Sequence, residues 1–263
     1  MNVVTPVLRY QWRDLARSRW MWGYAIFFAL VTEGLVRFGG STETALLSLI
    51  SITLFVVPLV SLVLGTVYLY GAREFTEVLL AQPVRRGQVF LGLYLGLTLP
   101  LVLAYLVGVG VPLAFEGLDL AAQRGPLAVL LATGAGITAI FTAGAFVIAV
   151  RTDDRLRGLG AAVGLWLITA IVFDGAVLLF ILIFGDYPLE RAMLVATFAN
   201  PLDLARILLL TQFDASALLG YTGAVFRQFF TGRAGLLVST LALAGWIAAP
   251  LTLGLRSFIR KDF

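Results

Sequence analysis

Residues 44–72 read TALLSLISITLFVVPLVSLVLGTVYLYGA, without one charged side chain. About 20 consecutive apolar residues are enough for a helix to cross the hydrocarbon core of a bilayer. Four later windows are of the same kind, namely 87–115, 125–150, 158–185 with a lone Asp174, and 234–255. A sixth run, 20–37, is apolar apart from Glu33 and Arg37. The sequence therefore predicts an all-α, polytopic membrane protein with six transmembrane helices.

The composition agrees with this fold class. Hydrophobic residues make up 60% of the 263 residues and charged residues 13%, and the mean hydropathy is +0.97. A soluble helical bundle is disfavoured, because apolar windows longer than about 20 residues recur five times along the chain. We find no internal repeat and expect one transmembrane domain over residues 1–263.

The basic residues predict how the chain is oriented. An even number of spans places both termini on one side, together with the links 73–86 and 151–157. These four regions hold thirteen of the nineteen Lys and Arg residues. By the positive-inside rule we expect this side, and so both termini, to be cytoplasmic. The pI near 9.7 follows from this topology, and we do not predict nucleic acid as a partner.

An amphipathic helix is predicted at residues 5–19, before the first span. Thr5 can cap its N-terminus and Pro6 can occupy its first helical position. An apolar stripe and a basic stripe follow at helical spacing, formed by Leu8, Trp12 and Leu15 and by Arg9, Arg13 and Arg17. We expect this helix to lie on the membrane lipids of the inner leaflet. The alternative is a solvated tail with incidental periodicity.

The link after the second predicted span reads REFTEVLLAQPVRRGQVFLG at residues 73–92. Two carboxylates at helical spacing precede a Leu-Leu pair, a proline and a double arginine, a pattern that can dock onto a soluble partner. The candidate docking residues are Glu74, Thr76, Glu77, Leu79, Leu80, Pro83, Arg85 and Arg86. The two arginines would hold the segment at the lipid headgroups. The alternative is a solvated loop that merely obeys the positive-inside bias.

Two carboxylates fall within the predicted membrane belt. A charged carboxylate near the centre of a membrane helix costs ~2.5–3.5 kcal/mol on insertion scales, so Asp174 needs compensation. It either faces a polar cavity on a transport path or makes a packing hydrogen bond to a Ser or Thr. Glu33 is better explained by an i,i+4 pair with Arg37 than by a contact with cargo.

The last predicted outer segment, residues 185–233, is too apolar for a free loop. Asn200 can cap a helix that begins at Pro201, so we expect short helices here that dip into the outer interface or pack against a partner. Asn200, Pro201 and Asp203 are the candidate contacts to an extracytoplasmic protein. No separately folded ectodomain is expected.

Catalysis by this chain is disfavoured by the residues that it lacks. It has no histidine and no cysteine, its only lysine is Lys261, and no Gly-rich loop ends in Gly-Lys-Ser/Thr. It therefore cannot hydrolyse nucleotide as a P-loop subunit, and it has almost no soft metal ligands. We predict no catalytic residue, no metal and no cofactor in this chain.

The 73–92 pattern resembles the link between the second and third spans of ABC-2 type permeases, the membrane subunits of ATP-driven exporters. The resemblance extends to the predicted interfacial helix, six spans, inner termini, long last outer segment and short basic tail. It implies a separate P-loop ATPase subunit that carries the ATP and Mg²⁺, and a second copy of this chain. Closure of the ATPases would then push on residues 73–86. The family often has Gly-Lys where this chain has Gly92-Leu93.

Within that family, three stretches resemble the permease of the nitrous oxide reductase maturation transporter and related multicopper enzyme maturation permeases. They are residues 79–86, the Phe173-Asp174-Gly175 run and residues 200–206. The resemblance implies a bacterial or archaeal cytoplasmic membrane, and export or mechanical signalling to a periplasmic protein. The alternatives are an exporter of a lipid, drug or peptide, and a membrane scaffold that transports nothing.

Two G-x-x-x-G spacings allow close helix approach, Gly92 with Gly96 and Gly160 with Gly164. We interpret both as packing within one chain in preference to a dimer seam. The expected homodimer therefore depends on the family resemblance alone.

Overall fold

The computed structural model describes residues 19–39, 41–115, 120–187, 189–212 and 232–261. All regular structure in these ranges is helical, which confirms the predicted all-α class. The helices are α2 (Arg19–Phe38), α3 (Thr42–Gly71), α4 (Arg73–Leu80), α5 (Arg86–Phe115), α6 (Leu120–Arg151), α7 (Arg155–Leu167), the π-helical η1 (Ile168–Val172), α8 (Phe173–Phe184), α9 (Glu190–Ala199), α10 (Pro201–Gln212) and α12 (Gly232–Arg260).

Six helices in this part of the chain are long and apolar enough to span a membrane, as predicted. They are α2, α3, α5, α6, the continuous α7–η1–α8 helix and α12. If α9 and α10 together cross the membrane, they form a seventh span. This span would be broken, because the two helices meet at an angle of 112°. The predicted interfacial helix at residues 5–19 lies outside the described residues, except for Arg19 at the start of α2.

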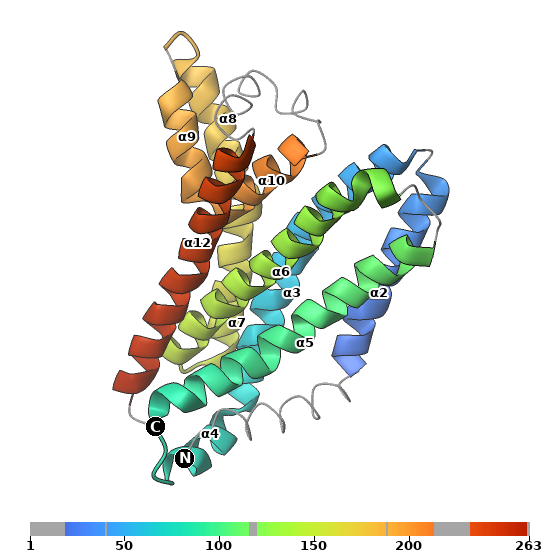
Figure 1. The fold of residues 1–263 in the computed structure, drawn as a ribbon. Helices are drawn as coiled ribbons and strands as arrows, with labels where there is room; N and C mark the ends of the chain where they lie inside the picture. The colour runs from blue at the N-terminus through green and yellow to red at the C-terminus, as the bar shows by residue number, and fades with distance from the viewer. Residues whose placement is uncertain (1–18, 40, 116–119, 188, 213–231, 262–263) are drawn as a thin grey trace.

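The bundle is built from long helices that pack side by side: α3 along α6, α2 along α5, and α12 against α6 (Figure 1). Gly108 on α5 lets α2 approach closely, because a Cβ atom there would lie 2.7 Å from the Ala25 carbonyl oxygen. Next to it, the ring of Phe28 packs edge-on against Tyr105 with centroids 5.3 Å apart. The core therefore sits between α2, α3, α5 and α6.

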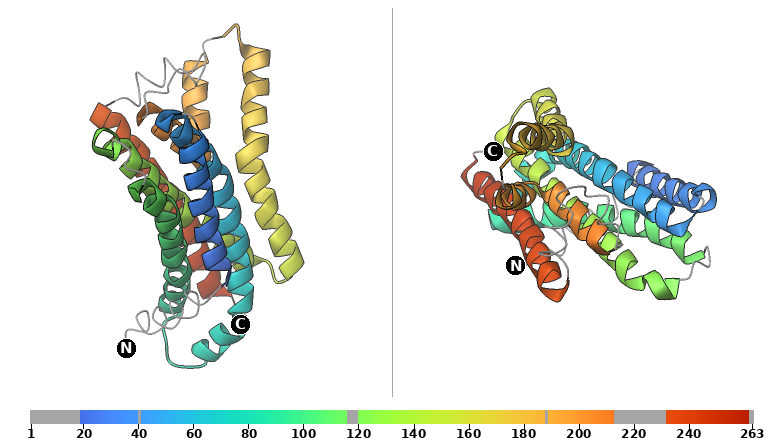
Figure 2. Two further views of the ribbon diagram at one scale, coloured as in Figure 1. Left: turned by 90° about the vertical axis from the view of Figure 1, so that its right-hand side faces the viewer. Right: turned by 90° about the horizontal axis from the view of Figure 1, so that it is seen from above.

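The α7–η1–α8 helix is the most exposed span. Figure 2 shows it standing at one side of the bundle, with α8 extending beyond the other long helices. Apolar side chains cover its outer surface, and Leu182 is 81% exposed. Such a surface in a membrane faces lipid or another protein.

The two G-x-x-x-G spacings differ in the structure. Gly92 and Gly96 are buried in α5, as the packing interpretation requires. Nothing lies within 4 Å of a Cβ atom built on Gly160 or Gly164. The interpretation was therefore wrong for Gly160 and Gly164, because α7 turns them away from the rest of the described bundle.

Candidate functional site

The predicted docking segment forms a short helix at one end of the bundle (Figure 1). Only Ala72 separates α4 from the end of α3, and Glu74 lies in the first turn of α4, where a carboxylate is favoured by the helix dipole. Glu74 and Glu77 are both exposed, and so are Pro83 and Arg85 in the turn toward α5. The segment thus presents an acidic face on α4 and a basic turn beside it.

The apolar part of this segment differs from the prediction. Leu79 and Leu80 are half-buried and pack against the core of this chain. Thr76 is 2% exposed and donates a hydrogen bond from Oγ1 to the Ala72 carbonyl, 2.7 Å away. The large apolar side chain that α4 exposes is Val78, at 65%. Sequence reasoning missed Val78 because it did not establish which side of α4 faces the core.

Arg86, which was predicted to lie at the lipid headgroups, has hydrogen-bond partners within this chain. Its Nη1 donates hydrogen bonds to the Ile259 and Lys261 carbonyls, at 3.0 and 2.7 Å. The last carbonyls of a helix have no partner within the helix, so a guanidinium can satisfy them. Arg86 therefore ties the start of α5 to the end of α12.

Asp153 joins three separate parts of the chain at this end of the bundle. Its Oδ1 pairs with Arg73, which opens α4, and accepts a hydrogen bond of 2.7 Å from Lys261 Nζ. Lys261 Nζ also donates to the Val150 carbonyl at the end of α6, at 2.8 Å. We call Arg73, Asp153 and Lys261 the Asp153 clasp. Its two cations, Lys261 first, hold the pKa of the Asp153 carboxyl below its usual value.

The loop that carries Asp153 is held in shape from both sides. Tyr70 at the end of α3 donates from its hydroxyl to the Thr152 and Asp154 carbonyls, at 2.8 and 3.2 Å. Asp154 caps α7, since its Oδ1 accepts from the backbone N–H groups of Leu156 and Arg157. The position of Asp153 is therefore fixed relative to α3, α6 and α7.

At the other end of the bundle, three of the predicted residues meet around an arginine. Arg206 Nη1 on α10 pairs with Asp174 Oδ2 on α8 at 2.9 Å and with Asp203 Oδ1 at 3.2 Å. We call Asp174, Asn200, Asp203 and Arg206 the Arg206 cluster. The charge of Asp174 is thus compensated by an ion pair, which neither predicted alternative included. The signal for Arg206 was its i+3 spacing from Asp203.

Asn200 connects the α9–α10 corner to the long exposed span. Its Oδ1 accepts from the Leu202 N–H at 3.1 Å, which confirms the predicted cap of a helix beginning at Pro201. Its Nδ2 donates to the Thr169 carbonyl of η1 at 2.8 Å. Asn200 is 1% exposed and Pro201 is also buried. Both residues are used inside this chain, so the structure does not support their predicted contact with a separate protein.

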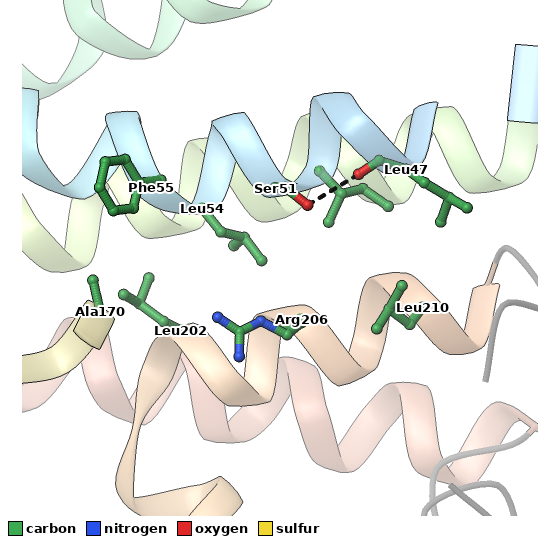
Figure 3. Close-up of a pocket in the computed structure, with 9 residues that line it drawn as sticks. Leu47, Ser51, Leu54, Phe55, Ala170, Leu202, Arg206 and Leu210 are labelled. Carbon is green, nitrogen blue, oxygen red and sulfur yellow. Dashed lines mark hydrogen bonds between the residues drawn. The ribbon is translucent and has the colours of Figure 1, made fainter. Parts of the chain in front are cut away.

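A cavity of about 400 Å³ lies between α3, η1 and α10, with Arg206 in its wall (Figure 3). Its other lining residues are apolar except Ser51. Glu33 does not belong to this site, because it forms the predicted i,i+4 ion pair with Arg37 on α2. Within the described ranges, no three His, Cys, Asp or Glu side chains lie close enough together to hold a metal ion.

Comparison with known proteins identifies the class. Residues 5–263 match the model of the ABC-2 family transporter proteins. The chain belongs to this family and is a multi-pass membrane permease subunit, without ATPase activity of its own, that works with an ATPase subunit.

Two curated relatives are similar over their full length. The chain is 30% identical to the probable ABC transporter permease protein NosY of Pseudomonas aeruginosa, over 99% of both chains. It is 28% identical to the protein of the same name from Stutzerimonas stutzeri, again over 99% of both chains. The present chain is therefore a NosY-like permease.

Proposed function

We propose that this chain is the permease of an ABC-2 type exporter that serves the maturation of nitrous oxide reductase, a copper enzyme. The observation that carries the coupling part of the proposal is α4, which presents exposed carboxylates and Val78 at the basic end of the bundle. The full-length similarity to the NosY permeases supports the maturation role. In this proposal the basic end lies in the cytoplasm of a bacterial or archaeal cell.

The partner surface follows from the chemistry of α4. The carboxylates of Glu74 and Glu77 would pair with basic side chains on the ATPase. Val78 would fit a small apolar pocket that lies between those basic side chains. Such a contact has an apolar centre and a charged rim, as stable interfaces do. ATP and Mg²⁺ bind in the ATPase subunit, and this chain contributes no cofactor.

The Asp153 clasp gives α4 a route to the membrane spans. Arg73 passes a displacement of α4 to Asp153, and so to the loop between α6 and α7. Lys261 passes it to the end of α12, which Arg86 ties to the start of α5. Four spans besides α3 are therefore attached to the segment on which the ATPase acts. Two arrangements of this clasp would provide the two states that coupling requires.

The exposed α7–η1–α8 helix supports assembly with a second copy. Gly160 and Gly164 leave open space beside α7, and small residues let a partner helix approach closely in a membrane. We propose that lipid covers the rest of this surface and that the interfacial segment at residues 5–19 lies on the same bilayer.

A copper ion is an unsuitable cargo for this chain, because the sequence has no histidine or cysteine. A sulfur-containing species, or purely mechanical coupling to a periplasmic protein, fits its composition better. A second candidate function, export of a lipid or another amphiphile, is favoured by the apolar cavity beside Arg206. A scaffold that transports nothing would leave the ATPase rate unchanged when such compounds are added.

Affinity purification from native membranes tests the coupling assignment. The wild-type chain should bring down a P-loop ATPase in stoichiometric amount. Glu77→Lys combined with Val78→Asp reverses a charge and removes the apolar centre of the contact. The amount of co-purified ATPase should therefore fall at least tenfold, while the variant still inserts in the membrane. Asp186→Lys, a charge reversal at the opposite end, is the control. Full ATPase retention by the double variant would refute the assignment.

The maturation role needs a separate experiment in the source organism. A strain that lacks this chain should make nitrous oxide reductase protein without its full copper content, and should release nitrous oxide. Normal copper content in that strain would remove the maturation role and leave the exporter assignment intact.

A further inference from the structure

The cavity beside Arg206 is formed by one face of each of two helices. Leu47, Ser51 and Phe55 lie at i, i+4 and i+8 on α3 and form one wall. On α10, Leu202, Arg206 and Leu210 have the same spacing and form the other wall, and Figure 3 shows the guanidinium between the two helices. The volume of about 400 Å³ is within the ~300–1,000 Å³ of small-molecule pockets.

The end of the cavity at Phe55 is held rigidly. Trp166 Nε1 donates to the Phe55 carbonyl at 3.0 Å, and the two rings pack edge-on with centroids 4.8 Å apart. Ala170 of η1 lines the same end and leaves room there because its side chain is a single methyl group. The apolar walls are therefore formed before any ligand binds.

Arg206 has hydrogen-bond donors that the described residues do not use. A guanidinium has five N–H donors, and both ion pairs of Arg206 are made through Nη1. Among the described residues, neither Nη2 nor Nε of Arg206 has a hydrogen-bond partner. Three donors are thus left at the wall of an apolar cavity, where an unused donor costs free energy.

The charges behind Arg206 restrict the head group of a ligand. Asp174 and Asp203 together exceed the single positive charge of the guanidinium, so a polyanion would be repelled by two carboxylates. An ammonium head group cannot accept the free N–H groups. The remaining choice is a head group with oxygen acceptors and at most one negative charge, joined to an apolar tail.

We propose that this cavity binds one apolar chain of an amphiphile whose head group accepts hydrogen bonds from Arg206 Nη2 and Nε. A fatty-acid carboxylate and the phosphate ester of a bilayer lipid share this chemistry. Whether the occupant is exported cargo rests on the proposed transporter function, whereas binding itself does not.

Photolabelling of the purified full chain tests the proposal, without any ATPase present. The probe is dodecanoate with a diazirine on its tail, used in detergent and in phosphatidylcholine nanodiscs, with mapping by mass spectrometry. We expect saturable labelling of the cavity faces of α3 and α10. Excess dodecanoate should reduce it at least tenfold, and dodecyltrimethylammonium should not. Labelling that is not saturable, or that both competitors reduce equally, would overturn the proposal.

Comparison of the two environments distinguishes the source of the ligand. Labelling in detergent and in nanodiscs identifies an amphiphile that binds in preference to the bilayer. Labelling in detergent alone identifies a bilayer phospholipid as the occupant, and both results support the site. Loss of ATPase binding in the α4 variant has no bearing on either result, so the two proposals fail separately.

Three variants locate the site. Arg206→Met with Asp174→Asn and Asp203→Asn removes the donors without leaving an unpaired carboxylate, and should weaken dodecanoate binding roughly tenfold or more. Ser51→Leu fills the cavity, keeps the ion pairs intact, and should abolish labelling of both walls. Ala176→Leu adds the same bulk to the exposed surface of α8 and should change nothing. Normal labelling in Ser51→Leu would place the probe elsewhere.

Discussion

Replacement of Asn200 by Ala tests how the α9–α10 corner is attached to the rest of the chain. The change removes the hydrogen bond to the Thr169 carbonyl and the cap on the Leu202 N–H. Side-chain hydrogen bonds between membrane helices contribute about 0.6 kcal/mol each on average and about 1.7 at most. The bond to the Leu202 N–H is an N-cap, which contributes about 0.5–2 kcal/mol, so loss of both costs about 1–4 kcal/mol.

The assay is thermal unfolding of the purified chain in detergent, in which size-exclusion chromatography measures the fraction that remains folded at each temperature. For a chain of this size a loss of 1 kcal/mol lowers Tm by about 2–4 °C, so Asn200→Ala should lower it by roughly 2–16 °C. Asn200→Asp keeps the oxygen that caps Leu202 but loses the donor to Thr169. It should show at least half of this decrease, because its carboxylate then faces a carbonyl.

Thr211→Ala is the matched control on the same helix. Among the described residues the Thr211 hydroxyl donates only to carbonyls of its own helix, at 2.9 Å, so its loss should change Tm by less than about 1 °C. Equal melting temperatures for Asn200→Ala and the wild type would show that Asn200 does not anchor the corner. The description of the Arg206 cluster as one unit would then be refuted.

Two further predictions concern the core and the Asp153 clasp. Gly108→Ala should destabilise the chain, because its Cβ would lie 2.7 Å from the Ala25 carbonyl oxygen, whereas Gly110→Ala has open space and should be neutral or stabilising in the same melting assay. The lowered pKa of Asp153 means that the clasp stabilises the chain above the unfolded value near 3.9 and is lost as pH falls through the lower folded value. Hydrogen exchange in residues 151–157, corrected for intrinsic rates, should therefore be constant from about pH 5 to 8, while Asp153→Asn should exchange faster throughout; a titration near neutrality would contradict this.

The spans could be predicted from the sequence because each one needs a long apolar window with few charges, and few other structures do. Their ends could not be placed as well. The last window was predicted to end at residue 255, but α12 continues to Arg260. A helix does not stop where its first charge occurs, since basic residues in its last turn interact favourably with the helix dipole.

The Arg206 cluster could be predicted only in part. The sequence alone predicts that the charge of Asp174 needs compensation and that a helix begins at Pro201 after the Asn200 cap. The contact between Arg206 on α10 and Asp174 on α8 depends on the 112° angle between α9 and α10, which places Arg206 beside α8. Local sequence rules predict that a helix begins at Pro201 but do not give its direction. The same limit applies to Asp153 and Lys261, which come together from 108 residues apart.

Site-directed cross-linking tests the central claim, that the ATPase acts on α4. The chain has no cysteine, so Val78→Cys creates a single thiol on the exposed face of α4. In the assembled complex, a short cross-linker with a maleimide for this thiol and an amine-reactive ester for lysine should join residue 78 to the ATPase subunit, with a yield that changes when ATP is added. Asp186→Cys at the opposite end should give no such product. A complex that retains its ATPase but forms no cross-link through residue 78 would contradict the claim.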